Sequence, residues 1–232
     1  MSSIWKHAGL AALILLSAAT APAQAAGDKD KSRADTPIKP VASLASIARI
    51  DRIPTLEAFL GMQPAPEWAG KLTKLDVFIQ ANPKDGAPST FRTEAYLGYD
   101  AKNLYVIFIC FDSEPGKIRA RLARRENIYD DDTVQIMLDT FHDQRRAYSF
   151  VINPLGIQLD RLYSESSGMD DSFDTIWDSE GKITAQGYVV RMAIPFRSLR
   201  FPSDAKNWGI VLQRIIPRLN ETSYWPRGGT QR

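Results

Sequence analysis

The sequence contains a single cysteine, Cys110, and two histidines. One cysteine excludes an internal disulfide, and so few histidines and cysteines exclude zinc sites built from these ligands. A serine–histidine–aspartate triad would depend on His142, because His7 lies in the N-terminal leader described below. His142 lies in a predicted turn, where we expect a solvated surface side chain. Cys110 belongs to the apolar run 105–111 and is expected to be buried.

The chain also lacks an excess of charge of one sign. It has 29 lysines and arginines against 27 aspartates and glutamates, a formal net charge of +2. Binding to nucleic acid or to an anionic membrane needs a dense patch of positive charge. The arginines at 119, 121, 124 and 125 are the densest basic group, and acidic residues flank them. We therefore expect no nucleic-acid partner.

Residues 1–25 have the pattern of a cleavable secretory signal peptide. Lys6 precedes the apolar run 10–21, and Ala23-Gln24-Ala25 follows it as a small-residue cleavage site. The apolar run is shorter than the roughly 20 residues that a permanent membrane helix needs. Residues 26–52 are polar, charged and proline-containing, as in a flexible linker. We therefore expect an exported protein with one domain at residues 53–232.

Alternating apolar and polar residues recur along this domain, with turn residues between them and no long amphipathic helical pattern. In residues 133–138, Val134, Ile136 and Leu138 share one face, which is typical of a half-buried strand. Residues 148–152 repeat the pattern after a short polar turn, which predicts a hairpin. Residues 104–111 are almost all apolar, so we expect a central strand covered on both faces. The other predicted strands are 75–80, 92–99, 157–161, 173–179, 183–185, 187–194 and 208–216.

The strand pattern predicts an all-β fold. Short strands separated by turns favour an antiparallel, jelly-roll-like β-sandwich of about nine to ten strands. A parallel α/β fold would need amphipathic helices between the strands, and the sequence shows none.

The acidic triplet Asp130-Asp131-Asp132 precedes the strand at 133–138. Acidic loops supply the hard oxygen ligands that Ca²⁺ prefers, so Asp130 and Asp132 are candidate ligands for a structural calcium ion. The triplet lacks the spacing of an EF-hand loop, which favours a solvated turn at the start of the strand over a calcium site. Both interpretations stay open.

Trp177 lies between Asp174 and Asp178 in a polar stretch. Sugar-binding sites place an aromatic ring against the apolar face of a pyranose, with charged groups that hydrogen-bond to its hydroxyls. A tryptophan in the core is the alternative. Trp208 begins an apolar strand and is expected in the core. No pair of carboxylates is singled out for glycoside hydrolysis, so enzymatic activity is the weaker interpretation.

Several motifs recur in order along residues 74–225: YD-x-x-NLYV, DD-x-V-x-I-x-LDTF-x-D-x-R, F-x-x-NP-x-G and IPF-x-SLRFP. In these motifs the chain resembles the family 9 carbohydrate-binding modules. It is most similar to the variant found N-terminal to an outer-membrane β-barrel in bacterial exported proteins. The resemblance implies a β-sandwich that binds the ends or short stretches of polysaccharides, often with structural calcium. Such modules are usually attached to a hydrolase or to another extracellular protein.

The resemblance also implies binding residues. They are Arg92, Glu94, Arg124, Arg125, Asn153, Asp174 and Trp177. The chain departs from the variant where Phe173-Asp174 replaces the usual Trp-Asp, which removes one hydrogen-bond donor.

The expected function is that of an exported module that binds poly- or oligosaccharides in the periplasm, outer membrane or at the cell surface. Its expected context is carbohydrate catabolism, and its possible protein partner an outer-membrane β-barrel. One alternative is a structural or docking domain without a sugar ligand. A domain of a glycoside hydrolase is another alternative. Haem binding through His142 with Met137 or Met169 is a third.

Overall fold

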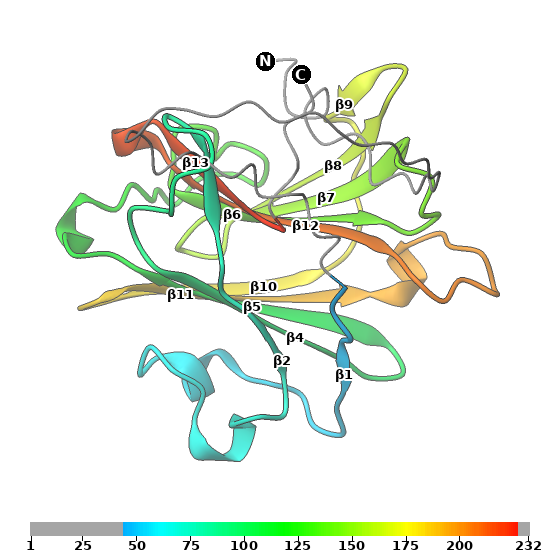
Figure 1. Ribbon diagram of the computed structural model, residues 1–232, viewed down its shortest axis with the longest axis horizontal. Helices are drawn as coiled ribbons and strands as arrows, with labels where there is room; N and C mark the ends of the chain where they lie inside the picture. The colour runs from blue at the N-terminus through cyan, green and yellow to red at the C-terminus, as the bar shows by residue number, and fades with distance from the viewer. Residues whose placement is uncertain (1–43, 227–232) are drawn as a thin grey trace, which may run out of the picture.

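The computed structural model describes residues 44–226, which form two β-sheets packed face to face (Figure 1). One sheet has six strands in the order β1-β4-β5-β11-β10, with β2 pairing with β4, and the other has seven in the order β3-β13-β12-β6-β7-β8-β9. Neighbouring strands are antiparallel except β1 and β4. The predicted all-β antiparallel sandwich is therefore confirmed. The predicted signal peptide, residues 1–25, lies outside the described residues.

The strands of the six-stranded sheet are β1 (Ala48–Arg49), β2 (Thr73–Leu75), β4 (Thr93–Tyr99), β5 (Asn103–Phe111), β10 (Asp178–Thr184) and β11 (Gly187–Pro195). Those of the seven-stranded sheet are β3 (Ile79–Asn82), β6 (Thr133–Asp139), β7 (Arg146–Ile152), β8 (Gln158–Ser164), β9 (Gly168–Asp170), β12 (Gly209–Ile216) and β13 (Glu221–Trp225). Short 3₁₀ turns are the helical elements within residues 44–226, and no helix there is long and apolar enough to cross a membrane.

The main core lies between the two sheets. In the β6–β7 pair, Ile136 faces Phe150 across the ladder, and the flanking residues follow the same register. The side chains that the alternation assigns to one face all belong to this core: Val134, Ile136, Leu138, Tyr148, Phe150 and Ile152. The period of two along each strand was sufficient to identify them, because one face of each strand must be buried.

The central strand β5 is covered on both faces, as predicted. Val106, Phe108 and Cys110 face the main core, while Ile107 and Ile109 face a second apolar cluster on the outer side of the six-stranded sheet. Cys110 is fully buried. A strand buried on both sides has no polar face, which explains its nearly continuous apolar sequence.

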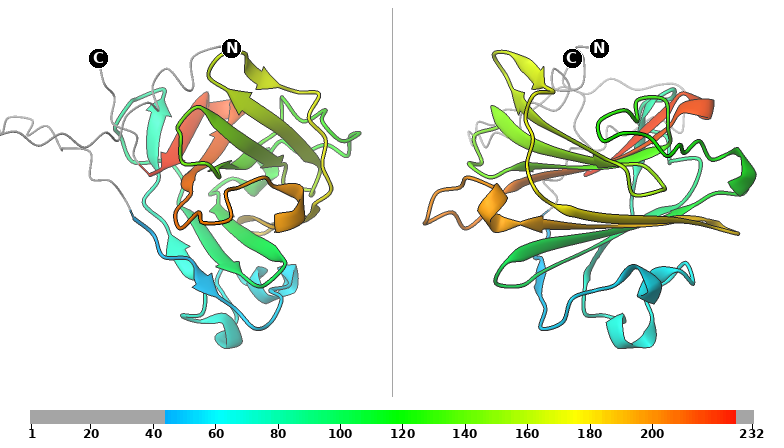
Figure 2. Two further views of the ribbon diagram at one scale, coloured as in Figure 1. Left: turned by 90° about the vertical axis from the view of Figure 1, so that its right-hand side faces the viewer. Right: turned by 180° about the vertical axis from the view of Figure 1, so that it is seen from behind.

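A third layer covers that outer face. It contains the 3₁₀ turns η2 (Leu56–Phe59) and η3 (Pro66–Trp68), which lie against β4 and β5 at the bottom of Figure 1 and in both views of Figure 2. The apolar side chains of this layer are Ile50, Leu56, Phe59, Met62, Trp68 and Leu72. Arg191 of β11 helps to hold the layer on the sheet, because its Nε donates to the Pro54 carbonyl at 2.6 Å.

The predicted linker, residues 26–52, ends earlier than expected. Ala48–Arg49 forms β1, and the Ile50 amide donates to the Tyr99 carbonyl at 2.8 Å. The close fit depends on Gly98, because a side chain there would begin 2.6 Å from Leu72 Cδ2 and 3.2 Å from Ile50 Cγ2. Residues 44–52 therefore belong to the domain, while residues 26–43 lie outside the described part of the chain.

Other differences concern short strands. Residues 173–177 are irregular, and the strand expected there begins instead at Asp178, as β10. Strands β9 and β13 were not predicted. Strands of three to five residues show too little alternation to stand out, and they form because a neighbouring strand supplies their hydrogen bonds.

Candidate functional site

Arg125 lies where the loop 124–130, strand β8 and the segment 173–177 meet. Its Nη2 donates to Asp160 Oδ1 and to the Thr175 carbonyl, both at 2.6 Å, and lies 3.1 Å from Asp174 Oδ1. Asp160 is fully buried and also accepts from the Thr175 amide at 2.7 Å. The Arg125 side chain is nevertheless 37% exposed, and no described residue accepts a hydrogen bond from its Nε or Nη1. The guanidinium is thus fixed in place with two of its nitrogens free.

Glu126 adds a third carboxylate to this group. Carboxylate oxygens of Glu126, Asp160 and Asp174 lie within 4.8 Å of one another. Glu126 has a φ of 74°, a left-handed conformation that is uncommon outside glycine, and its amide donates to the Gln158 carbonyl at 2.7 Å. These oxygens could approach a cation, but the Arg125 guanidinium already lies against two of them and opposes a second positive charge.

Tyr129 presents an aromatic ring beside these charges. Ile128 anchors the loop by packing against Val151 and Leu159, which leaves the next residue, Tyr129, 53% exposed. The Tyr129 hydroxyl donates to Asp171 Oδ2 at 3.3 Å. Partial burial and the negative charge of Asp171 raise the pKa of this hydroxyl, so it stays protonated as a donor.

Together these residues form what we call the edge site: Arg125, Glu126, Tyr129, Asp160, Asp171 and Asp174. It combines an exposed ring, a fixed guanidinium and several carboxylates, and 68% of the Asp174 side chain is exposed. Sequence reasoning identified Arg125 and Asp174 but missed Tyr129. Adjacent apolar residues, Ile128 and Tyr129, were the available signal, because an extended loop against a sheet buries only one of two neighbours.

Trp177 is not an exposed platform. It is 4% exposed and its ring contacts Phe150 at a centroid distance of 5.3 Å in an edge-on geometry. Its carbonyl accepts from Gln158 Nε2 at 2.8 Å, which fixes the backbone so that the ring enters the main core. The structure therefore agrees with the core alternative for this tryptophan.

Arg92 and Glu94 lie apart from the edge site. The Arg92 guanidinium stacks 3.7 Å from the Phe111 ring centroid, and the buried Glu94 accepts from Lys74 Nζ at 2.8 Å. This hydrogen bond is the main reason that the pKa of Lys74 is raised. Strands β5 and β11 separate β4 from β10 in the six-stranded sheet, and β10 is the strand that approaches the edge-site side.

Two glycines, Gly156 and Gly181, allow a close contact between the turn before β8 and strand β10. A Cβ on Gly181 of β10 would lie 2.6 Å from the Gly156 nitrogen, and Gly156 itself has a φ of +86°. Ser179 Oγ donates to the Gly156 carbonyl at 2.8 Å across the same contact. The turn before β8 thus packs directly on β10. Because β5 and β11 separate β10 from β4, the edge site and the pair Arg92 and Glu94 lie on opposite sides of the sandwich.

Asn153 has a structural role. It is fully buried, and its Nδ2 donates at 3.0 Å to both Asp131 Oδ2 and the Arg121 carbonyl. Its Oδ1 accepts from the Leu155 and Ile157 amides, which closes the turn before β8. All its polar atoms are used inside the fold, so it holds the loop that presents Arg125 and has no group left for a ligand.

Asp130 and Asp132, the predicted calcium ligands, differ in burial and in their partners. Asp130 is exposed and lies 3.5 Å from Arg121 Nη2, whereas Asp132 is buried and accepts from the Arg119 amide at 2.9 Å. Burial raises the pKa of Asp132. The two carboxylates therefore have different partners in the structure. Arg124 is exposed and pairs with no described carboxylate.

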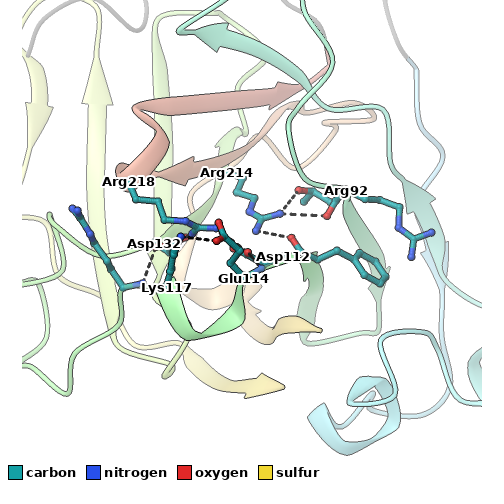
Figure 3. A network of polar contacts seen from close by, with 10 residues as sticks. Arg92, Asp112, Glu114, Lys117, Asp132, Arg214 and Arg218 are labelled. Atoms are coloured by element: carbon teal, nitrogen blue, oxygen red, sulfur yellow. Dashed lines mark hydrogen bonds and ion pairs between the residues drawn. The ribbon is translucent and has the colours of Figure 1, made fainter. Parts of the chain in front are cut away.

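Asp132 belongs to a second charged group, the interior cluster of Asp112, Asp132, Arg214 and Arg218 (Figure 3). Arg218 Nη2 donates to both Asp112 oxygens, at 2.8 and 2.6 Å. Arg214 is fully buried, and its guanidinium donates to Thr93 Oγ1 and the Phe111 carbonyl, each at 3.0 Å. It thereby joins β12 of one sheet to β4 and β5 of the other.

A family model described as "Carbohydrate family 9 binding domain-like" matches residues 65–216, more than half of the chain. The chain belongs to this family. No curated protein matches it. The family 9 fold also agrees with solved structures. One is a family 9 carbohydrate-binding module from Caldicellulosiruptor kristjanssonii in complex with glucose, with a TM-score of 0.53 and 15% identity over 77% of this chain and 83% of that one.

A putative carbohydrate-binding protein from Bacteroides uniformis is similar as well. It has a TM-score of 0.58 and 13% identity, over 80% of this chain and 91% of that one. Identities this low establish a shared sandwich and no more. The position and ligand of a binding site in this family 9 domain must come from its own residues.

Proposed function

We propose that this family 9 domain binds carbohydrate at the edge site. The observation that supports it most is the Arg125 guanidinium, which short hydrogen bonds fix in place while Nε and Nη1 stay free at the surface. A donor that is already held in position loses little conformational entropy when a ligand binds. The family provides independent support for this ligand class.

The chemistry of the site suits a sugar. Free guanidinium nitrogens donate to ring hydroxyls, while the exposed Asp174 carboxylate accepts from them, and such charge-assisted hydrogen bonds are the stronger kind. The half-exposed Tyr129 ring offers an apolar face to the C–H groups of a pyranose. Acidic residues outnumber Arg125 in the edge site, which favours neutral over anionic sugars.

Calorimetry with glucose and a panel of β-glucans, xylans and bacterial glycans tests the proposal. Arg125→Ala and Tyr129→Ala should each weaken binding at least about tenfold, which corresponds to about 1.4 kcal/mol. Arg145→Ala is the matched control, because Arg145 is an exposed arginine paired with Glu165 elsewhere. A folded protein that binds no glycan, or equal losses in the control, would contradict the proposal.

A structural or docking role is the second candidate function. Burial of Trp177 and Asn153 favours it, because it removes two of the implied binding residues from the surface. This role predicts that the folded domain binds no sugar and that Arg125→Ala leaves its association with a partner unchanged. Release of reducing sugar, lost on replacing one carboxylate, would instead identify a glycosidase.

We also propose that residues 1–25 direct export and that the domain serves carbohydrate catabolism in the periplasm, outer membrane or at the cell surface, beside an outer-membrane β-barrel. The support is the leader pattern and the order of the motifs. Cell fractionation with N-terminal sequencing should find a mature chain that begins at Ala26. An uncleaved chain in the cytoplasm would contradict export.

Calcium binding through Asp130 and Asp132 stays a prediction. The partners of these carboxylates, Arg121 and Arg218, compete with a cation. A site that binds Ca²⁺ only in the folded state would raise the melting temperature when Ca²⁺ is added and lower it with a chelator. An unchanged melting temperature in both conditions would speak against calcium at these residues.

A further inference from the structure

The connection between β11 and β12 crosses from one sheet to the other at one end of the sandwich and projects from it in Figures 1 and 2. It brings three aromatic rings together. The centroid distances are 5.2 Å for Phe201 and Trp208, 6.1 Å for Phe196 and Trp208, and 6.5 Å for Phe196 and Phe201. Phe196 and Trp208 pack on the main core, whereas Phe201 belongs to no core cluster and is 41% exposed. Phe201 is therefore the outermost ring of the group.

The loop that presents these rings is held firmly. The Arg200 amide donates to the Tyr148 hydroxyl at 3.0 Å, and Thr140 Oγ1 donates to the Arg200 carbonyl at 2.5 Å. Ser198 Oγ donates to the Ile176 carbonyl at 2.8 Å. These bonds from Ser198 and Arg200 to three different segments fix the backbone that leads into Phe201 before any ligand arrives, which lowers the entropic cost of binding.

The same loop has unpaired positive charge. Arg197, Arg200 and Lys206 are exposed, and none of them forms an ion pair within residues 44–226. Asp204 is the one acidic residue of the loop. In the edge site, by contrast, carboxylates surround the arginine. A group of rings with unpaired guanidinium and ammonium groups is complementary to a ligand that has apolar faces and negative charges.

We propose that this end surface, formed by Phe196, Arg197, Arg200, Phe201, Lys206 and Trp208, binds a polysaccharide that carries carboxylate groups. The Phe201 ring packs on a sugar face, and Arg197 and Arg200 pair with carboxylates of the chain. The surface shares no residue with the edge site and differs from it in the sign of its charge, although Ser198 joins its loop to the segment 173–177 that also holds Asp174. The domain then has two glycan-binding surfaces with different preferences.

Calorimetry of the full chain with oligogalacturonate, and with the same oligomer as its neutral methyl ester, tests the proposal. Phe201→Ala should weaken oligogalacturonate binding at least about tenfold, and so should the pair Arg197→Gln and Arg200→Gln. The methyl ester should bind at least about tenfold more weakly than the acid. Phe141→Ala is the matched control, because Phe141 is similarly exposed and lies against Arg146. It should retain full affinity, and melting temperatures show that each variant is folded.

Several results would overturn the proposal: no binding of oligogalacturonate by the folded protein, equal binding of acid and ester, or full affinity in Phe201→Ala. Loss of oligogalacturonate binding in Arg125→Ala would overturn it too, because the ligand would then occupy the edge site. The proposal for the edge site is judged separately, by whether neutral glycans bind and whether Arg125→Ala abolishes that binding.

Discussion

The edge site and the interior cluster are built from the same residue types, arginine and aspartate, yet they differ in access to water. Arg125 is pinned by carboxylates and keeps free nitrogens at the surface. Arg214 and Arg218 lie among Asp112, Asp132 and backbone carbonyls inside the fold. Buried charges without partners are costly, so the interior pairs hold the sheets together. The comparison teaches that exposure, rather than residue type, separates a binding group from a structural one.

The interior cluster should give the largest loss of stability. Arg218→Met leaves Asp112 buried without its bidentate partner, and we expect the free energy of unfolding to fall by about 3–5 kcal/mol. Arg125→Met should cost less, because that side chain is more than a third exposed and water replaces part of the interaction. Urea unfolding of both variants measures the difference. Equal losses would remove the distinction between the two groups.

The two aromatic residues extend the same comparison. Trp177→Ala should lower the free energy of unfolding by about 3–5 kcal/mol, because it empties space in the main core. Tyr129→Ala should change it by only about 0.5 kcal/mol, since the ring is half exposed, and should act on glycan affinity instead. Thermal unfolding and calorimetry on both variants check this. A stable Trp177→Ala with impaired binding would reverse the assignment.

Replacing Asn153 is expected to lower both the stability of the protein and its affinity for glycans. Asn153→Ala leaves the Leu155 and Ile157 amides without their acceptor and removes one of the donors to Asp131, so we expect a loss of stability of about 1–3 kcal/mol. Because the same bonds hold the loop before Arg125, glycan affinity should fall as well. Faster amide exchange in residues 121–131 would accompany this. Intact affinity at unchanged protein stability would show that the loop is held by other contacts.

The smallest expected effect is a dependence of the free energy of unfolding on pH. Burial raises the pKa of Asp132 in the folded state above its ordinary value of 3.8. As pH rises through the interval between these two values, the unfolded chain releases its proton first, so the free energy of unfolding decreases. Asp132→Asn should remove this decrease. Urea unfolding from pH 3.5 upward gives the slope of the free energy of unfolding against pH for the wild-type protein and for the variant. An identical slope in both would contradict the contribution of Asp132.

Sequence alone predicted the parts of the fold that depend on local alternation. The faces of β6 and β7 were correct because each strand is long enough for its period to show. Strands β1, β9 and β13 were missed, since pairing with a neighbour defines them more than their own composition does.

The candidate site was predicted only in part. Arg125 contacts both Asp174 and Asp160, and the contact with Asp160 joins residues 35 positions apart, which no local pattern reveals. The burial of Trp177 depends on packing against Phe150 and the rest of the main core, which only the assembled sheets provide. Tyr129 is exposed because Ile128 is buried, and which neighbour is buried is decided by the sheet beneath.

The layer over the outer face of the six-stranded sheet has a consequence for how this module is inherited. The family match begins at residue 65, yet Ile50, Leu56 and Phe59 already cover the apolar side chains of β4 and β5. A gene fusion that transferred residues 65–216 alone would produce a sandwich whose outer apolar face is partly exposed to water, which favours aggregation. Recombination can therefore move this domain intact only if residues 48–64, from β1 onward, are transferred with it.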